Sequence, residues 1–225
     1  MTAVARAAIA SPITANSNVI SSLTDFAPEG VERGVGLALQ DDQRRYVFFL
    51  AGTRHQCPPG ECFYAGIGGH VEIGQSWLDC AQREAREEIG TEVRVVSASQ
   101  TYWVTQDGSV QQVNLTDEPR PLALYEMIHQ ADAPRAGELY RIVIYRAQLT
   151  DIPSDLPPDE VQGIVGLTAE QVKHSLERKP TLSELLEEGA EIIASASDIS
   201  GMTRLYPIGT ARALAQMMQH MGGDI

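Results

Sequence analysis

The sequence predicts an α/β sandwich with a mixed sheet and extra helices near its C-terminal end. Two observations predict this class. The expected elements follow the order strand, strand, strand, helix, further strands and helix, which differs from regular βαβ winding. The composition, with 43% hydrophobic and 21% charged residues, is that of a chain able to form a substantial core. The length of 225 residues suits one large domain with appendages.

Strand-forming residues dominate the first part of the expected domain. Residues 33–40 and 45–51 are strand-like runs, and the polar residues 41–44 between them predict a hairpin. A break rich in proline and glycine follows, and residues 63–65 then continue as a short third strand.

A helix is predicted over residues 76–89. Ser76 is a suitable N-cap with Asp79 three positions later, and Gly90 is a typical residue to end a helix. A cluster of glycines precedes this helix, at Gly66, Gly68, Gly69 and Gly74.

The second half of the chain continues the alternation of elements. Strands are expected over 92–106, 121–129, 138–149 and 161–167, and helices are expected from about Thr168, over 181–194 and over 209–221. These elements predict three segments, namely a flexible N-terminal arm (1–30), a main domain (31–175), and a helical C-terminal extension (176–225) packed on that domain.

The charge of the chain limits its partners. With 17 Lys+Arg against 30 Asp+Glu, the formal net charge is −13. A nucleic-acid polymer needs a basic face to neutralise its phosphates, and an anionic membrane needs the same, so neither partner is expected. No apolar run is long enough to suggest a membrane span. A bound metal can reverse the local sign of a site, so a small phosphorylated ligand stays possible.

Three cysteines bear on the cellular compartment. Cys57, Cys62 and Cys80 cannot all pair within the chain, which favours reduced thiols and a cytoplasmic protein.

The helix at 76–89 carries one apolar stripe and, beside it, a group of carboxylates. Glu84, Glu87 and Glu88 fall within an arc of about 100° on an ideal helix. Such close carboxylates raise one another's pKa unless a cation intervenes, and hard oxygen ligands suit Mg²⁺ or Mn²⁺. The alternative is a solvated helix with Arg–Glu pairs, such as Arg83 with Glu87. The glycines of the preceding loop allow close approach of a metal or phosphate, and therefore favour the site.

Residues 69–91 resemble the Nudix box, whose pattern is G-x5-E-x7-R-E-U-x-E-E-x-G-U with U a bulky aliphatic residue. The sequence has Gly69, five residues, Gln75, seven residues, and then the run REAREEIGT that begins at Arg83. The spacing matches throughout. The expected strand order on both sides is also similar to the Nudix sandwich, so the resemblance covers about residues 33–175.

The resemblance implies roles for particular residues. The glutamates that hold metal in the family correspond to Glu84, Glu87 and Glu88. The carbonyl of Gly68 would be a further ligand, and Arg83 would orient a neighbouring carboxylate. A late acidic residue before a strand is commonly another ligand or a base in the family, and Glu160 is the candidate. The alternative for Glu160 is a plain surface carboxylate.

The sequence departs from the family pattern at several positions. Gln75 replaces the first glutamate, which in the family usually supports the loop through polar contacts. Glutamine can keep a hydrogen bond but loses the charge. Ala85 and Thr91 replace bulky aliphatic residues and affect packing, and Gly166 stands where the family often has tryptophan.

The function implied by the resemblance is divalent-metal-dependent hydrolysis of a nucleoside diphosphate linked to another moiety. ADP-ribose-like compounds and dinucleotides are the substrates expected from family frequency. A homodimer is also suggested, and the Met-rich stretch near residue 218 could contribute to its interface. Two alternatives are a Nudix-fold nucleotide sensor with little or no turnover, which Gln75 favours, and a scaffold that binds no metal.

Overall fold

The computed structural model describes residues 20–129, 135–223 and 225. Most of the expected N-terminal arm, residues 1–19, lies outside this range. Residues 20–30 contain a short helix, α1 (Leu23–Phe26), in which Leu23 and Phe26 are buried. The C-terminal part of the expected arm is therefore packed against the domain.

Eleven strands form one mixed sheet within the described residues. They are β1 (Glu32–Gln40), β2 (Tyr46–Ala51), β3 (Glu61–Ala65), β4 (Val93–Val96), β5 (Thr101–Thr105), β6 (Val110–Val113), β7 (Ala123–Ile128), β8 (Leu139–Leu149), β9 (Val161–Leu167), β10 (Glu191–Ser195) and β11 (Arg204–Pro207). The main order is β10-β9-β2-β1-β8-β7-β5-β6, with β3 joined to β2 and β11, and β4 joined to β8.

Parallel and antiparallel pairs are combined in this sheet. Strands β1 and β8 pair in parallel over nine registered positions from Glu32 to Gln40, and β5 pairs in parallel with β7. The β1–β2, β2–β9 and β7–β8 pairs are antiparallel. The expected hairpin and the mixed character of the sheet are both confirmed.

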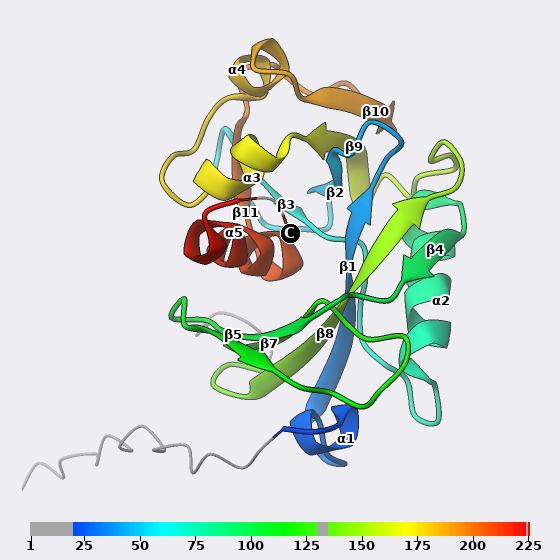
Figure 1. Cartoon of the computed structure of the whole chain (residues 1–225). Helices are drawn as coiled ribbons and strands as arrows, with labels where there is room; N and C mark the ends of the chain where they lie inside the picture. Colours follow the sequence, from blue (N-terminus) through cyan, green and yellow to red (C-terminus); the bar gives the residue numbers. More distant parts are fainter. Residues whose placement is uncertain (1–19, 130–134, 224) are drawn as a thin grey trace, which may run out of the picture.

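Helices cover the sheet on both faces, as Figure 1 shows. The helices besides α1 are α2 (Trp77–Ile89), α3 (Ala169–His174), α4 (Leu182–Glu187) and α5 (Gly209–Met221). Helix α2 lies on one side of β1 and β8, whereas α3 and α5 lie on the other. Each face has its own core, one containing Ala81, Ala85 and Ile89 of α2 and the other Leu214 and Met218 of α5. The α/β/α sandwich expected from the sequence is confirmed.

The C-terminal segment differs from the expectation of a purely helical extension. The predicted helix over 181–194 is wrong in its second half. It ends near Gly189, which has a positive φ of 105° and donates its N–H to the Leu186 carbonyl. The next residues include Ile192 and Ile193, which are β-branched, and they pair with β9 as strand β10. Strand β11 then pairs in parallel with β3, so this segment extends the sheet itself.

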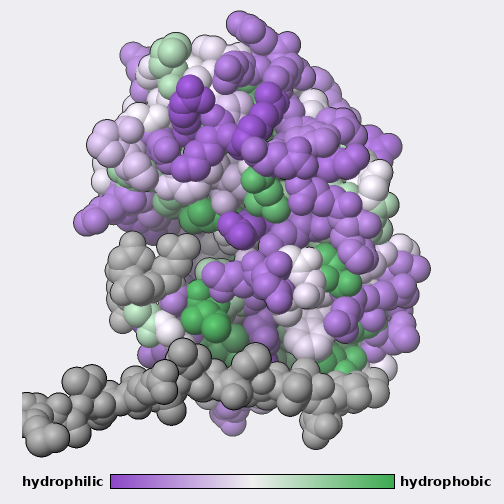
Figure 2. Space-filling view, turned by 90° about the vertical axis from the view of Figure 1, so that its left-hand side faces the viewer, coloured by the Kyte–Doolittle hydropathy of each residue, from purple (hydrophilic) through white to green (hydrophobic). Residues whose placement is uncertain are grey.

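The Met-rich helix α5 packs into the core. Met217 and Met218 are fully buried, as methionine often is when it fills gaps between elements. These two side chains are therefore not available for a dimer interface. Figure 2 shows the side of the molecule that faces left in Figure 1, where hydrophilic residues predominate and hydrophobic patches are small. None of the described helices has the length and apolar character needed to cross a bilayer.

Candidate active site

The glycine loop between β3 and α2 is bonded to strand β1. The carbonyl of Ile67 accepts from Leu37 N–H at 2.9 Å, and the carbonyl of Gly69 accepts from Val35 N–H at 2.9 Å. Gly68 lies between them with a φ of 146°, and a side chain there would collide with the Val35 carbonyl. Only glycine fits this position without strain.

The Gly68 peptide faces helix α2. The Ile67 carbonyl and the Gly68 N–H belong to one trans peptide group and point in opposite directions. Because the carbonyl is bonded to β1, the Gly68 N–H points away from β1 and donates to Glu88 Oε2 at 2.8 Å. The loop and the helix are therefore fixed to each other at the centre of the predicted site.

Helix α2 has the boundaries that its sequence predicts. The Ser76 side chain accepts from Asp79 N–H, and Gly90 closes the helix in a left-handed conformation. The stripe of Ala81, Ala85 and Ile89 is fully buried against the sheet. Ala85, which replaces a bulky residue of the family pattern, is packed in this core.

The three helical glutamates occupy two environments. Glu84 and Glu88 are buried, with 9% and 4% exposure, whereas the Glu87 side chain is 57% exposed. Burial raises the pKa of Glu84, and the nearby carboxylates of Glu87 and Glu160 raise it further against the opposing effect of Arg83. Burial also raises the pKa of Glu88 well above its usual value, and Glu84 and Glu160 act in the same direction.

Arg83 links the carboxylates to the glycine loop. Its guanidinium lies 2.8 Å from Glu84 Oε1 and 2.8 Å from Glu87 Oε2, and it donates to the His70 carbonyl at 2.9 Å. The predicted contact between Arg83 and a neighbouring carboxylate is present. The pair Arg83–Glu87, which the solvated-helix alternative named, exists as well, but Glu84 and Glu88 on the same helix are not solvated.

Gln75 takes part in the same network. Its side-chain oxygen accepts from Glu72 N–H at 3.1 Å and from Arg83 Nη2 at 3.4 Å. The uncharged amide therefore links two residues of the loop, Gln75 and Glu72, and also contacts Arg83 on the helix.

Glu160 lies at the same end of the sheet as the glycine loop, because the end of β2 lies beside the start of β1. It precedes β9, its carbonyl accepts from Gly52 N–H at 2.8 Å, and its carboxylate pairs with Arg54. Its charge contributes to the raised pKa of both Glu84 and Glu88. Glu160 is thus an electrostatic neighbour of Glu84 and Glu88, although about 75 positions separate them in sequence.

Arg54, which the sequence did not single out, and His55 lie beside the cluster. They follow β2 in a loop that runs beside Asp159 and Glu160, and the Arg54 N–H donates to the Asp159 carbonyl at 2.8 Å. The His55 ring packs against Phe49 and Phe63, and burial lowers its pKa. A basic residue three positions after a buried strand was the available signal.

The donor set suits a hard divalent cation. Buried carboxylate oxygens come together beside a backbone that allows close approach, and Mg²⁺ and Mn²⁺ prefer such ligands. Gly69 is pressed so closely on Glu84 that a side chain there would overlap the carboxylate. Among the described residues, no group of three His, Cys, Asp or Glu side chains lies in a metal-binding arrangement. The chemistry of the buried carboxylates fits a hard divalent cation.

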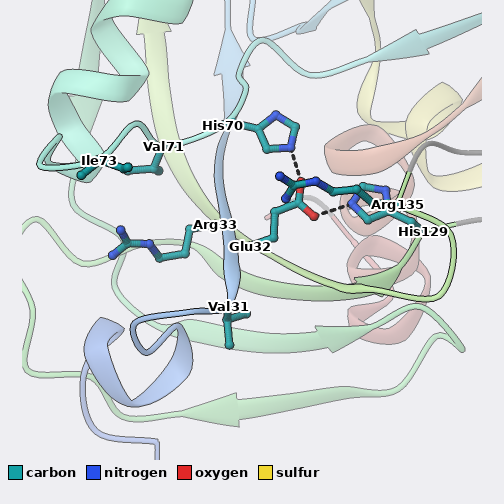
Figure 3. A pocket seen from close by; sticks show the side chains of 8 residues that line it. All are labelled: Val31, Glu32, Arg33, His70, Val71, Ile73, His129 and Arg135. Atoms are coloured by element: carbon teal, nitrogen blue, oxygen red, sulfur yellow. Dashed lines mark hydrogen bonds and ion pairs between the residues drawn. The ribbon is translucent and has the colours of Figure 1, made fainter.

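A cavity of about 600 Å³ adjoins the glycine loop (Figure 3). It is lined by Val31, Glu32, Arg33, His70, Val71, Ile73, His129 and Arg135. The Glu32 carboxylate at its centre has three basic partners, with His70 Nε2 at 2.5 Å, His129 Nε2 at 2.8 Å and Arg135 Nη1 at 3.2 Å. Burial alone would raise the pKa of Glu32, but these hydrogen bonds outweigh it and hold the pKa below its usual value.

Comparison with known proteins identifies the family. The NUDIX domain family matches residues 30–188. No curated protein matches the chain in sequence. Among solved structures, the chain is similar to a NUDIX family hydrolase from Clostridium perfringens, with 15% identity, 63% of this chain and 84% of that chain covered, and a TM-score of 0.42. It is also similar to an Ap4A hydrolase from C. elegans, with 16% identity, coverage of 66% and 88%, and a TM-score of 0.40. Since the family match spans more than half of the sequence, the chain belongs to the Nudix family of pyrophosphohydrolases.

Proposed function

We propose that the protein is a divalent-metal-dependent hydrolase that cleaves the diphosphate linkage of a nucleoside diphosphate joined to another moiety. One observation carries the proposal. Glu84 and Glu88 are buried next to each other and to Glu160, and burial together with this proximity raises the pKa of both. Concentrated, buried negative charge at the end of a glycine loop is what a divalent cation would neutralise.

The metal ligands in this proposal are the carbonyl of Gly68 and the carboxylates of Glu84, Glu87 and Glu88. When bound, Mg²⁺ or Mn²⁺ supplies charge neutralisation for the diphosphate and lowers the pKa of a coordinated water. Glu84 and Glu88 form the buried pair. Glu87 is more exposed and would join on the solvent side, where Arg83 already holds its carboxylate.

Three further features position the groups of the site. Arg83 orients Glu84 and Glu87 by its two contacts of 2.8 Å. Glu88 is aligned by the N–H of Gly68. Glu160, which pairs with Arg54, is the candidate to accept the proton of the attacking water. Such fixed charges account for most of the rate enhancement expected for phosphoryl chemistry.

A substrate panel tests the proposal. ADP-ribose, dinucleoside polyphosphates and other nucleoside diphosphate derivatives are incubated with Mg²⁺ or Mn²⁺, and the products are identified by mass. We expect cleavage between the phosphorus atoms of at least one compound, and no cleavage when a chelator replaces the metal. ADP-ribose-like compounds and dinucleotides are the first candidates.

The alternative function is a nucleotide sensor without turnover, which the uncharged Gln75 favours. Binding of nucleotides without cleavage of any compound in the panel would support the sensor and contradict the hydrolase. Absence of metal binding in a calorimetric titration would contradict both and support a scaffold.

A cytoplasmic location and a homodimer stay predictions, which fractionation and light scattering can test. The segment boundaries at residues 30 and 175 also stay predictions.

A further inference from the structure

The cavity beside the glycine loop has two unlike walls (Figure 3). Val71 and Ile73 form an apolar wall, and Ile73 is fully exposed to solvent. His70, His129 and Arg135 surround the Glu32 carboxylate on the opposite side. A volume of about 600 Å³ lies in the range that holds a small organic ligand.

The polar wall is preorganised. Glu32 itself is almost completely covered, and its contacts fix the imidazoles of His70 and His129 and the guanidinium of Arg135. Both imidazoles also stack on the Tyr140 ring, with centroid distances of 4.9 Å and 5.3 Å and interplanar angles below 20°. His70 is held in this way while its side chain stays 62% exposed. The flat imidazole of His70 is therefore held in one orientation at the cavity.

The cavity is continuous with the proposed catalytic cluster through the backbone of the loop. His70 follows Gly69, whose backbone rests directly against the Glu84 carboxylate. The His70 carbonyl accepts a hydrogen bond from Arg83 at 2.9 Å. A molecule whose diphosphate is bound through a divalent metal at Glu84 and Glu88 would thus have its attached group near the cavity.

We propose that this cavity binds the base of the substrate's nucleoside, with the ring stacked on the His70 imidazole and in contact with Val71 and Ile73. The inference rests on the proposed function, because it places the nucleoside of that substrate. A flat heteroaromatic ring matches an aliphatic wall facing an aromatic one. Arg33 and Arg135 donate hydrogen bonds and accept none, so they suit the acceptor atoms of a base or the neighbouring phosphate. Glu32 is a positioning residue that aligns His70 and Arg135.

Two ligands that differ only in the base test the proposal. Adenosine monophosphate and ribose 5-phosphate are titrated calorimetrically into the full chain in Mg²⁺ buffer; both lack the diphosphate and are not cleaved. We expect the nucleotide to bind about tenfold more tightly, the size of effect typical of one stacked base. His70→Ala should abolish this preference, and His70→Phe, which keeps an aromatic ring, should retain most of it.

His174→Ala is the matched control, because His174 is an exposed histidine that contacts Glu170 and Glu177 on helix α3. It should leave the preference unchanged. Equal binding of the two ligands by the parent chain, or an unchanged preference in His70→Ala, would overturn the nucleoside site. Either result is distinct from failure of the proposed function, which the substrate panel reports by cleavage.

Discussion

Glu32 and Glu88 are two buried carboxylates that the fold treats in opposite ways. Glu32 is surrounded by His70, His129 and Arg135, and its pKa is lowered. Glu88 accepts the N–H of Gly68 but faces the carboxylates of Glu84 and Glu160, and its pKa is raised. Burial disfavours the charge in both cases, so the partners decide the outcome. The first carboxylate is balanced by the chain itself, whereas the second is suited to a cation from solution.

The largest expected effect is on catalysis. Glu88→Gln keeps the shape of the side chain but removes a charge from the proposed metal site, so kcat should fall at least about a hundredfold. Glu188→Gln is the control, because Glu188 also lies in a Glu-Glu pair near a helix end but contacts only Arg178 in the described network. It should retain parental activity. Steady-state rates on the best panel substrate provide the measurement, and a fully active Glu88→Gln would contradict the proposed site.

Next in size is the effect of metal on stability. A ligand that binds only the folded state adds about 2.7 kcal/mol to the free energy of unfolding at a hundredfold excess over its Kd. Mg²⁺ or Mn²⁺ should therefore raise the Tm of the parent chain and have much less effect on Glu88→Gln. Thermal denaturation with and without chelator measures this. Equal metal-induced shifts in the two proteins would show that the ion binds elsewhere.

The pH dependence of the metal-free protein follows from the same carboxylate. Because the pKa of Glu88 is raised in the folded state, that state binds the proton more tightly than the unfolded chain does. The stability contributed by protonated Glu88 is present below its unfolded pKa of about 4.5 and is lost as the pH rises through the folded pKa. As the pH rises through this range, the free energy of unfolding of the parent should therefore fall relative to that of Glu88→Gln. Urea titrations from pH 4.5 upward test the sign.

Glu32→Gln should lower the free energy of unfolding at neutral pH, the opposite of the effect expected for Glu88→Gln. Glu32→Gln removes the charge that pairs with three basic groups, of which only His129 is largely covered, and leaving one such covered group poorly paired costs about 1–3 kcal/mol. Glu126→Gln is the control, since Glu126 pairs with Arg141 and is less buried. We expect the loss at Glu32 to exceed the loss at Glu126 in urea denaturation at pH 7. A stabilising Glu32→Gln would remove the contrast between the two carboxylates.

The smallest effect is expected at Arg54, which contacts Glu160 from the loop after β2. Arg54→Ala should lower kcat about tenfold by releasing the Glu160 carboxylate, with little change in KM, and Arg54→Lys should restore part of the loss because it keeps the charge. A change in KM alone would place Arg54 in substrate binding instead.

Local signals were sufficient to predict helix α2 and the loop before it. Ser76 and Gly90 mark the helix ends, and the apolar stripe is buried as its spacing indicates. The arc of three glutamates was predicted correctly as a helical face, but only Glu84 and Glu88 are buried. The difference arises because Glu87 lies farther round the helix, toward solvent and Arg83.

Long-range relations were not available from the sequence. The cluster of Glu32, His129 and Arg135 joins strand β1 to the residues around the β7–β8 connection, and no pattern in the chain connects these positions. Strand β11 was missed because it is only four residues long and forms its hydrogen bonds with β3, which lies about 140 positions earlier. Strand β6 was missed because Gln111 and Gln112 interrupt its apolar pattern.

The pairing of β3 with β11 has a consequence for synthesis of the chain. Strand β3 leads directly into the glycine loop, yet one of its edges is completed by residues 204–207. During translation the strand that supports the active site keeps an open edge until almost the whole chain has left the ribosome. Contacts so distant in sequence form late, because closing a long loop costs entropy before the contact can stabilise it. A chain that ends prematurely before residue 204 would therefore carry the complete box without the strand that secures it.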